Sequence, residues 1–161
     1  MTSYRSTPAI TELFAKLAIT ADGMQISSVQ RADTEPEFHE CATESEYIQN
    51  LVQAARESKE LKGTTAFVAL STEAATRTAQ LLGDDSPALI GEGDTLPNSG
   101  SILLALPLAK GLEFDHVVIV NASKEDFPDN DLSRRRLYTA ISRATSTVSV
   151  FSNGELSPLL K

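Results

Sequence analysis

The sequence predicts an α/β fold, a largely parallel β-sheet flanked by helices, and three observations carry this prediction. From residue 64 onward, segments typical of strands alternate with segments typical of helices, which is the pattern of a sheet covered by helices. Residues 102–106 and 117–120 are unbroken apolar runs, as expected for strands that are buried on both faces. With 161 residues, of which 41% are hydrophobic, the chain can bury one core. We therefore expect residues 1–161 to form a single domain.

The first forty residues predict one helix and two short strands. Thr7 and Pro8 fit the cap and the first position of a helix. The apolar stripe of this helix would comprise Ile10, Leu13, Phe14 and Leu17. The polar, alternating segments 24–29 and 37–41 predict modest strands.

Capping signals bound the elements that follow. Residues 43–46 read Thr-Glu-Ser-Glu, a capping box that opens a helix, and Lys62-Gly63 ends it. Residues 64–70 predict a compact apolar strand. Ser71 caps the next helix, and Gly83 ends that helix. The remaining strands are expected at residues 87–90, 102–106, 117–120 and 147–151.

The composition excludes several classes of protein. A net charge of −8 argues against a free-standing nucleic-acid-binding protein, whose surface is normally basic. The single cysteine, Cys41, cannot form an internal disulfide. Since His39 is its only nearby ligand candidate, we expect a buried thiol in a reducing compartment and no metal site. No apolar run approaches the length of a membrane span and no signal peptide is visible, so we expect a cytoplasmic protein without a membrane partner.

An arginine-rich segment near the C-terminus is the most informative stretch of the chain. Residues 134–144 read Arg-Arg-Arg-Leu-Tyr-Thr-Ala-Ile-Ser-Arg-Ala, with apolar side chains at helical spacing, and Asp131 or Ser133 can cap the predicted helix. Arg136 and Arg143 would then lie two turns apart on nearly the same face.

Three cations in the first turn of a helix are unfavourable, because each costs about 0.3–1 kcal/mol beside the positive end of the helix dipole. The pattern leaves two interpretations open. Upstream carboxylates can neutralise the arginines on a solvated surface, namely Asp126, Asp129 and Asp131. Alternatively, an anion from elsewhere, such as a phosphate group, completes the site.

Residues 137–144 (Leu-Tyr-Thr-Ala-Ile-Ser-Arg-Ala) resemble motif VI of the superfamily 1 helicases of the UvrD/Rep type, usually Leu-Tyr-Val-Ala-x-Thr-Arg-Ala. In that family the arginine of the motif reaches the γ-phosphate of ATP held by a neighbouring domain, a role that the resemblance assigns to Arg143. A guanidinium suits this role because it is always charged and forks onto phosphate oxygens. We take Arg136 as a further nucleotide contact.

Two more segments resemble motifs of the same family. Tyr4-Arg5-Ser6 is similar to motif IV, usually Asn-Tyr-Arg-Ser. The resemblance implies that Tyr4 packs on the adenine and that Arg5 is a second γ-phosphate contact, although Ser3 replaces the usual Asn.

Residues 110–115 (Lys-Gly-Leu-Glu-Phe-Asp) precede an apolar strand and resemble motif V. The ends of central strands are where α/β folds place ligands. By the resemblance, Gly111 lets the backbone approach the nucleotide, Glu113 hydrogen-bonds a ribose hydroxyl, and Lys110 lies near phosphate or the nucleic-acid backbone.

These three motifs, in the family's order, imply a second RecA-like motor domain (2A), a fragment of a longer motor protein. The sequence contains no Gly-x-x-x-x-Gly-Lys-Ser/Thr phosphate loop. The resemblance therefore implies that ATP with Mg²⁺ is bound mainly by an N-terminal motor domain of the same polypeptide, and that this chain supplies arginine fingers in trans. Single-stranded or duplex DNA is the expected substrate of such a motor, and we expect the isolated domain to be inactive.

Two departures from the family pattern keep alternatives open. Ala105 and Pro107 stand where Rep-like enzymes have threonine and histidine in motif V. Both departures resemble the helicase-IV-like (HelD) branch, some members of which act on RNA polymerase. A non-catalytic α/β module that docks a protein is a further alternative. An independent hydrolase lacks support, because the only imidazoles are His39 and His116, and we expect His116 to be structural.

Overall fold

The computed structural model describes residues 37–96 and 100–160. Its strands are β1 (Glu37–Cys41), β2 (Thr64–Ala69), β3 (Ala88–Leu89), β4 (Gly100–Ala105), β5 (Phe114–Ile119) and β6 (Ala144–Asn153). Its helices are α2 (Glu44–Ser58), α3 (Thr72–Leu82), α4 (Leu106–Ala109) and α5 (Asp131–Ile141), with 3-10 turns η1 (Gly83–Asp85) and η2 (Pro158–Leu160).

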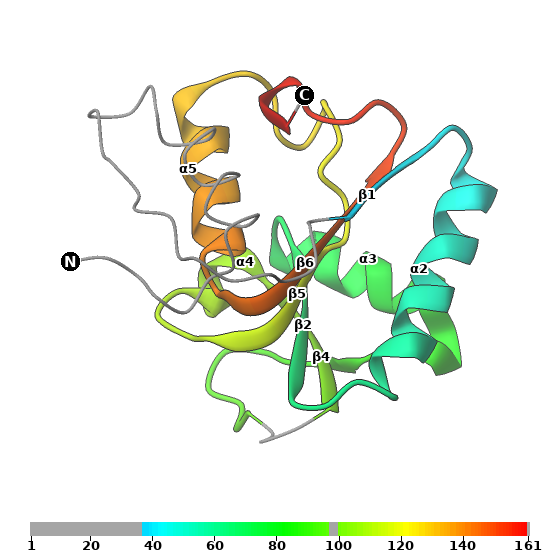
Figure 1. The fold of residues 1–161 in the computed structure, drawn as a ribbon, viewed down its shortest axis with the longest axis vertical. Coiled ribbons are helices and arrows are strands. Elements are labelled where there is room, and N and C mark those ends of the chain that lie inside the picture. The colour runs from blue at the N-terminus through cyan, green and yellow to red at the C-terminus, as the bar shows by residue number, and fades with distance from the viewer. Residues whose placement is uncertain (1–36, 97–99, 161) are drawn as a thin grey trace.

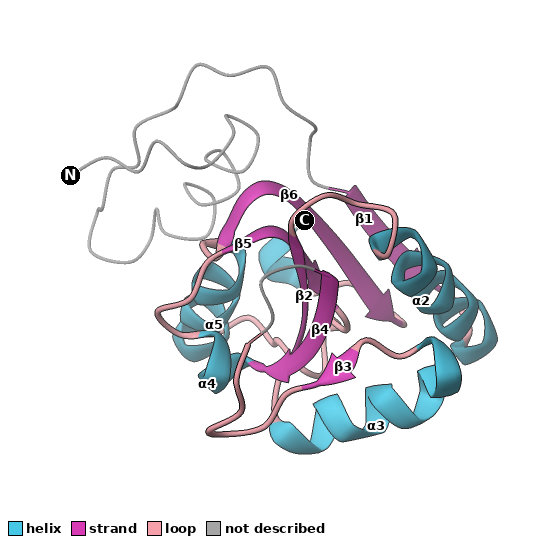
Figure 2. Ribbon diagram, turned by 90° about the horizontal axis from the view of Figure 1, so that it is seen from below, coloured by secondary structure: helices cyan, strands magenta, loops and turns pink. Residues whose placement is uncertain are grey.

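The six strands form one sheet in the order β1-β6-β5-β2-β4-β3, and every neighbouring pair is parallel. Helices α2 and α3 cover one face of the sheet, and α4 and α5 cover the other (Figures 1 and 2). The predicted α/β class and largely parallel sheet are therefore confirmed.

Each face of the sheet carries its own hydrophobic cluster. The cluster toward α4 and α5 includes Val68, Leu104, Val117, Leu137 and Ile141. The cluster toward α2 and α3 includes Leu51, Phe67, Leu82, Leu103 and Val118. Consecutive residues of β2, β4 and β5 thus contribute to opposite clusters, because successive side chains of a strand point to opposite faces. This burial on both faces explains why the central strands read as unbroken apolar runs.

The predicted caps of α2 and α3 are confirmed. The Thr43 hydroxyl accepts a hydrogen bond of 3.2 Å from the backbone N–H of Glu46. The Ser71 hydroxyl accepts one of 3.1 Å from the backbone N–H of Ala74. Gly83 ends α3 with a φ of +57°, a conformation that glycine adopts without the Cβ penalty of other residues.

Two predictions for the arginine-rich segment are wrong. Asn130, rather than Asp131 or Ser133, caps α5, and its side chain accepts from the backbone N–H of Ser133. The helix ends at Ile141, so Arg143 lies outside it and does not share a helical face with Arg136.

The physical reason for the early end of α5 is recruitment of the chain into the sheet. The backbone N–H of Phe114 donates a 2.8 Å hydrogen bond to the carbonyl of Arg143, and Ala144 pairs with Phe114 in the β5–β6 register. Consequently β6 begins at Ala144 rather than at residue 147. Similarly, β4 spans Gly100–Ala105 and β5 begins at Phe114, a few positions away from the predicted bounds.

Some predictions fall outside the described residues. These are the helix after Pro8, the strand at 24–29, and the candidate site residues Tyr4 and Arg5. Within the part of the chain that the structure describes, no helix is long and apolar enough to cross a membrane.

Candidate functional site

Three cationic side chains line one pocket between α4 and α5. The pocket has a volume of about 290 Å³ and is lined by Leu106, Pro107, Lys110, Arg135, Arg136 and Thr139. No carboxylate is among these lining residues, and Lys110, Arg135 and Arg136 are all exposed. Below we call this the cationic pocket. Its chemistry suits an anion with several oxygen atoms, such as a phosphate chain.

The two helices hold these cations in place through their buried sides. Pro107 stands in the first turn of α4, where a missing N–H costs no helical hydrogen bond. Lys110 follows the end of this short helix. On α5 the buried stripe is Leu137, Ala140 and Ile141, which leaves Arg135 and Arg136 on the exposed side.

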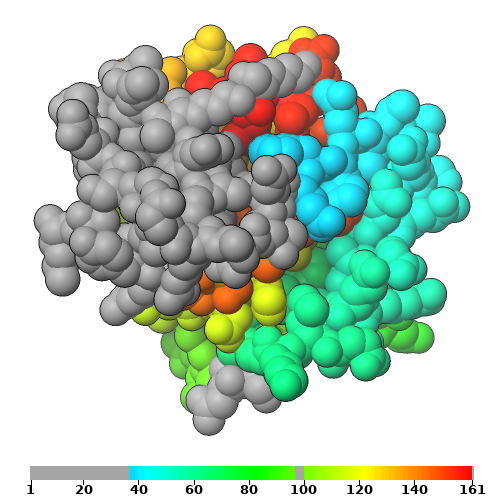
Figure 3. Space-filling view, viewed as in Figure 1, coloured from blue at the N-terminus to red at the C-terminus, as the bar shows by residue number. Residues whose placement is uncertain are grey.

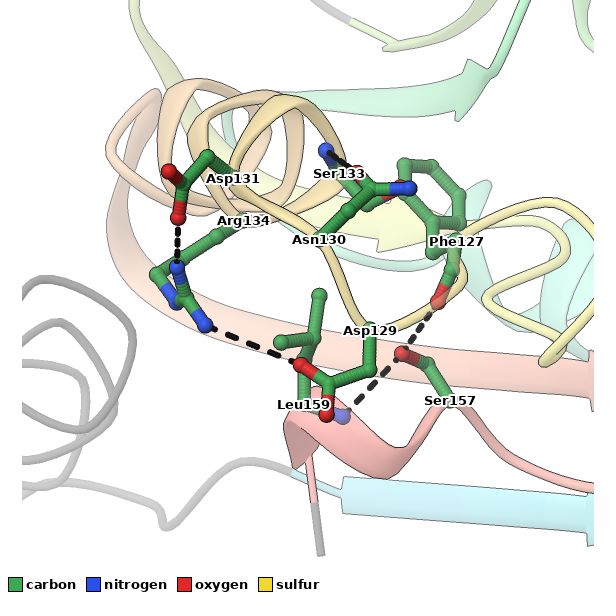
Figure 4. Close-up of polar contacts among 8 residues, drawn as sticks. All are labelled: Phe127, Asp129, Asn130, Asp131, Ser133, Arg134, Ser157 and Leu159. Carbon is green, nitrogen blue, oxygen red and sulfur yellow. Dashed lines mark hydrogen bonds and ion pairs between the residues drawn. The ribbon is translucent and has the colours of Figure 1, made fainter. Parts of the chain in front are cut away.

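The adjacent Arg134 has different surroundings. Its guanidinium pairs with Asp131 and lies 3.7 Å from Asp129, as Figure 4 shows. Neutralisation by upstream carboxylates therefore occurs at Arg134. Arg135 and Arg136 form no ion pair with another described residue.

The start of α5 is anchored to the C-terminal turn η2 (Figure 4). The Asn130 side chain accepts a 2.8 Å hydrogen bond from the backbone N–H of Ser133. The Ser157 hydroxyl donates a 2.6 Å bond to the carbonyl of Phe127 and accepts one from the backbone N–H of Leu159. These bonds fix the end of α5 that carries the arginines.

Arg143 lies at the other end of α5 and does not line the cationic pocket. Its Nε and Nη2 atoms lie 3.3 and 3.0 Å from the Ser142 hydroxyl, to which they donate, and the side chain is half-buried. The backbone carbonyl of Arg143 accepts a hydrogen bond from the backbone N–H of Phe114. Arg143 therefore lies beside the first residue of β5, which follows Glu113 in the sequence. The guanidinium forms no ion pair with a described residue.

Gly111 lies in the turn between α4 and β5 with a φ of +81°, and an added Cβ would meet no atom within 4 Å. The positive φ alone accounts for a glycine at this position. Close approach of its backbone to a nucleotide stays a prediction, as does the ribose contact of Glu113, which is exposed at the start of β5.

The predicted site residues thus form two groups. Lys110 and Arg136 meet in the cationic pocket, whereas Glu113 and Arg143 lie at the start of β5 and just before β6. Arg135 was not predicted as a site residue. Its spacing to Thr139, one helical turn further along, is the signal that places both on one face of α5.

The remaining polar candidates have structural surroundings. Cys41 is buried and its sulfur accepts from the Asn50 side chain, which agrees with the predicted buried thiol. The two ring nitrogens of His116 lie 2.6 Å from the Thr147 hydroxyl and 3.2 Å from the Lys62 carbonyl. In residues 37–96 and 100–160, no group of three or more His, Cys, Asp or Glu side chains could hold a metal ion.

Comparisons with known proteins show what the sequence and the fold of this chain resemble. Residues 107–151 match the model of the UvrD-like helicase C-terminal domain, and this segment includes the cations of the cationic pocket and Arg143. The structure is similar to the C-terminal domain of a possible DNA helicase from Lactobacillus plantarum WCFS1, with a TM-score of 0.81 and 28% sequence identity. That likeness covers 99% of this chain and 92% of the other. No curated protein sequence matches the chain.

Proposed function

We propose that this chain, with the fold and the signature segment of a UvrD-like helicase C-terminal domain, is the second motor domain of an ATP-dependent DNA helicase or translocase. In this proposal it supplies cationic groups to ATP that is bound on a companion N-terminal domain of the same polypeptide. The cationic pocket is the observation that carries the proposal.

The charges of the cationic pocket support a phosphate-bearing ligand. Lys110, Arg135 and Arg136 line one pocket without a lining carboxylate, so their mutual repulsion is uncompensated. Because α5 begins at Asp131, Arg135 and Arg136 lie in its second turn, beyond the reach of the helix dipole. A triphosphate that entered the pocket would relieve the mutual repulsion through charge-assisted hydrogen bonds.

Arg143 is proposed to act on the γ-phosphate. Its guanidinium is held only by the hydroxyl of the neighbouring Ser142 among the described residues, so it can exchange a neutral partner for phosphate oxygens. Bound Mg²⁺ and the phosphate loop would belong to the companion domain, because this sequence contains no such loop. The contribution of Arg143 is then electrostatic stabilisation across the domain interface, and an arginine of this kind is worth about 10³–10⁵ in rate.

Substitution of Arg143 in the full-length parent protein tests the proposal. Arg143→Ala should leave ATP affinity within a few-fold and lower kcat about a hundredfold or more. Arg143→Lys should restore little, because a point charge does not reproduce the planar fork. Steady-state ATP turnover and nucleotide binding are measured side by side, and normal turnover of Arg143→Ala would refute the proposed role.

Arg134→Ala is the matched control. Asp129 and Asp131 form their ion pairs with Arg134, so the charge of Arg134 is already neutralised. Arg134→Ala should therefore leave kcat nearly unchanged. Arg136→Ala should weaken ATP binding several-fold, since it removes one cation from the cationic pocket.

A second candidate function is remodelling of a protein assembly such as RNA polymerase, as in the HelD type. Ala105 and Pro107 offer no side-chain hydrogen-bond donor. Both line a second cavity of about 540 Å³ that also contains Glu92 and Asp94, with no Lys or Arg among its lining residues. Such a surface repels a phosphate backbone rather than attracting it.

The response of the parent's ATPase to DNA separates the two candidates. Under the second candidate, single-stranded DNA stimulates ATP turnover only weakly, because the carboxyl end of β4 has no group to relay its binding. Turnover is measured against increasing DNA at physiological salt. A stimulation of about tenfold or more would favour an ordinary DNA helicase. If the parent neither hydrolysed ATP nor contained a phosphate loop, the remaining interpretation would be a non-catalytic α/β module that docks a protein.

A further inference from the structure

A third cavity lies on the opposite face of the sheet, between α2 and strands β1, β6, β5 and β2. Its volume is about 430 Å³. Because α2 and α4–α5 lie on opposite faces (Figures 1 and 2), the sheet separates it from the cationic pocket. Figure 3 shows a face of the molecule on which the residues of β1 and α2, in cyan to teal, are at the surface.

A row of polar side chains crosses the floor of this cavity. Thr65 of β2 is paired in register with His116 of β5, which in turn is paired with Thr147 of β6, and all three line the cavity. The helix-covered face of a parallel sheet is normally apolar. Further along the same three strands this face is indeed apolar, with Phe67, Val118 and Phe151 in the cluster toward α2 and α3. Three adjacent strands thus turn polar together at this point.

The hydrogen bonds of the row leave acceptors without a donor. The Nε2 atom of His116 lies 3.2 Å from the Lys62 carbonyl, which can only accept, so Nε2 carries the proton. In the tautomer with its proton on Nε2, Nδ1 accepts from the Thr147 hydroxyl at 2.6 Å, and this uses the only hydrogen of that hydroxyl. The Thr65 hydroxyl, in a side chain that is 1% exposed, has no partner among the described residues. A buried hydroxyl without a partner carries a desolvation cost that a bound ligand would remove.

The charge of the lining residues indicates the sign of the ligand. Glu37 and Glu57 line the cavity, whereas no Lys or Arg does. Both carboxylates belong to exposed residues and so lie toward its mouth, and the Ser149 hydroxyl donates to Glu37. The cavity therefore offers the Thr65 hydroxyl, which is unpaired among the described residues and can accept or donate, and two carboxylates, which set the sign of the ligand.

We propose that this cavity binds a small organic cation, an ammonium or guanidinium group on a short alkyl chain. The N–H groups of the ligand donate to the Thr65 and Thr147 oxygens and to the carboxylates, and its alkyl part lies against Ala54 and Leu61 of the lining. The volume falls in the range of about 300–1,000 Å³ that is usual for small-molecule sites. This inference is independent of the proposed motor function.

Titration of the 161-residue chain with matched probes tests the charge requirement. n-Butylguanidinium and n-butylammonium are compared with n-butylurea, a neutral analogue of the guanidinium, and with pentanoate. Two-dimensional NMR should show saturable chemical-shift changes at Thr65, His116 and Glu57 for the two cations. The affinity for n-butylurea should be lower by a factor of at least about ten, and pentanoate should not bind. Equal binding of n-butylurea, or the absence of saturable binding by either cation, would overturn the proposal and leave a water-filled cavity.

Variants locate the site. Thr65→Val should retain the fold and weaken cation binding several-fold, and Thr65→Ser should restore it, because serine keeps the hydroxyl. Glu57→Gln should weaken binding by about tenfold, whereas Glu73→Gln, an exposed carboxylate on α3, should have no effect. Cooperative thermal unfolding of each variant verifies the fold. Unchanged affinity in both Thr65→Val and Glu57→Gln would contradict the assignment.

Discussion

Arg134, Arg135 and Arg136 are neighbours in the sequence, yet the fold gives them different surroundings. Arg134 is 16% exposed and pairs with two aspartates, whereas Arg135 and Arg136 line the cationic pocket. An arginine that is already paired with a carboxylate gains little interaction energy from a further anion, whereas an unpaired arginine gains more. For this reason the role of each arginine follows from its partners rather than from its residue type.

Asp126 is the carboxylate for which a pH effect on stability is expected. Burial raises the pKa of Asp126, an effect that the positive charge of Arg77 opposes and the negative charge of Glu125 reinforces. Because the folded pKa lies above the unfolded value, the unfolded chain loses its proton first as the pH rises. The loss of stability from ionised Asp126 is therefore absent well below its ordinary pKa of 3.8 and complete above its folded pKa.

Asp126→Asn should therefore raise the free energy of unfolding at pH 7 and have little effect at pH 3. The amide keeps an acceptor oxygen for the Asn121 side chain, which donates to Asp126 at 3.4 Å. Urea denaturation at the two pH values measures the difference. Asp84→Asn, at an exposed position in η1, is the control. A loss of stability at pH 7 would show that ionised Asp126 stabilises the fold.

At the scale of elements, α5 is the helix that positions the cations. It begins at the Asn130 cap, which the Phe127 and Ser157 contacts hold near η2, and ends where β6 takes over the chain. Both ends are thus set by contacts with other parts of the fold. The orientation of Arg135 and Arg136 depends on both.

Asn130→Ala should lower the free energy of unfolding by about 1 kcal/mol, because the backbone N–H of Ser133 loses its acceptor. Asn130→Asp should retain most of the stability, since a carboxylate accepts the same hydrogen bond and favours a helix N-terminus. Chemical denaturation of both variants measures this difference. Equal loss in the two variants would mean that the acceptor oxygen is not what stabilises this position.

At the scale of the whole molecule, the sheet separates the cationic pocket from the cavity under α2, and the two differ in the charge of their lining residues. The cationic pocket lies with α4 and α5, and the cavity with acidic residues at its mouth lies with α2. The overall charge of −8 therefore conceals a local basic site. A net charge describes the far field of a protein, and short-range contacts to a nucleotide are decided by the residues of one pocket.

The isolated chain should fold cooperatively and show no ATP hydrolysis above a buffer blank, with or without DNA. The reason is that its sequence contains no phosphate loop, which cradles the phosphates and supplies a Mg²⁺ ligand in this class of motor. Phosphate release is measured on protein whose thermal unfolding is cooperative, so that inactivity is not due to misfolding. Turnover that survives repurification would contradict the division of the site between two domains.

The sequence was sufficient for features that depend on neighbouring residues. The caps at Thr43 and Ser71, the glycine end of α3, and the central apolar strands all follow from local hydrogen bonding and from burial on both faces. The nucleotide contacts expected of Lys110 and Arg136 stay predictions, although the structure places both residues at one pocket. The roles of Tyr4 and Arg5 stay predictions, because these residues lie outside the described part of the chain.

Only the tertiary structure decided the features that depend on contacts between distant segments. The end of α5 before Arg143 requires the hydrogen bond from Phe114, and the polar row requires the registers that align Thr65, His116 and Thr147. Helical periodicity continues through Ala144 in the sequence, but strand pairing with β5 outweighs it. A register between parallel strands is set across crossovers of many residues, so no local pattern could have revealed which polar side chains meet.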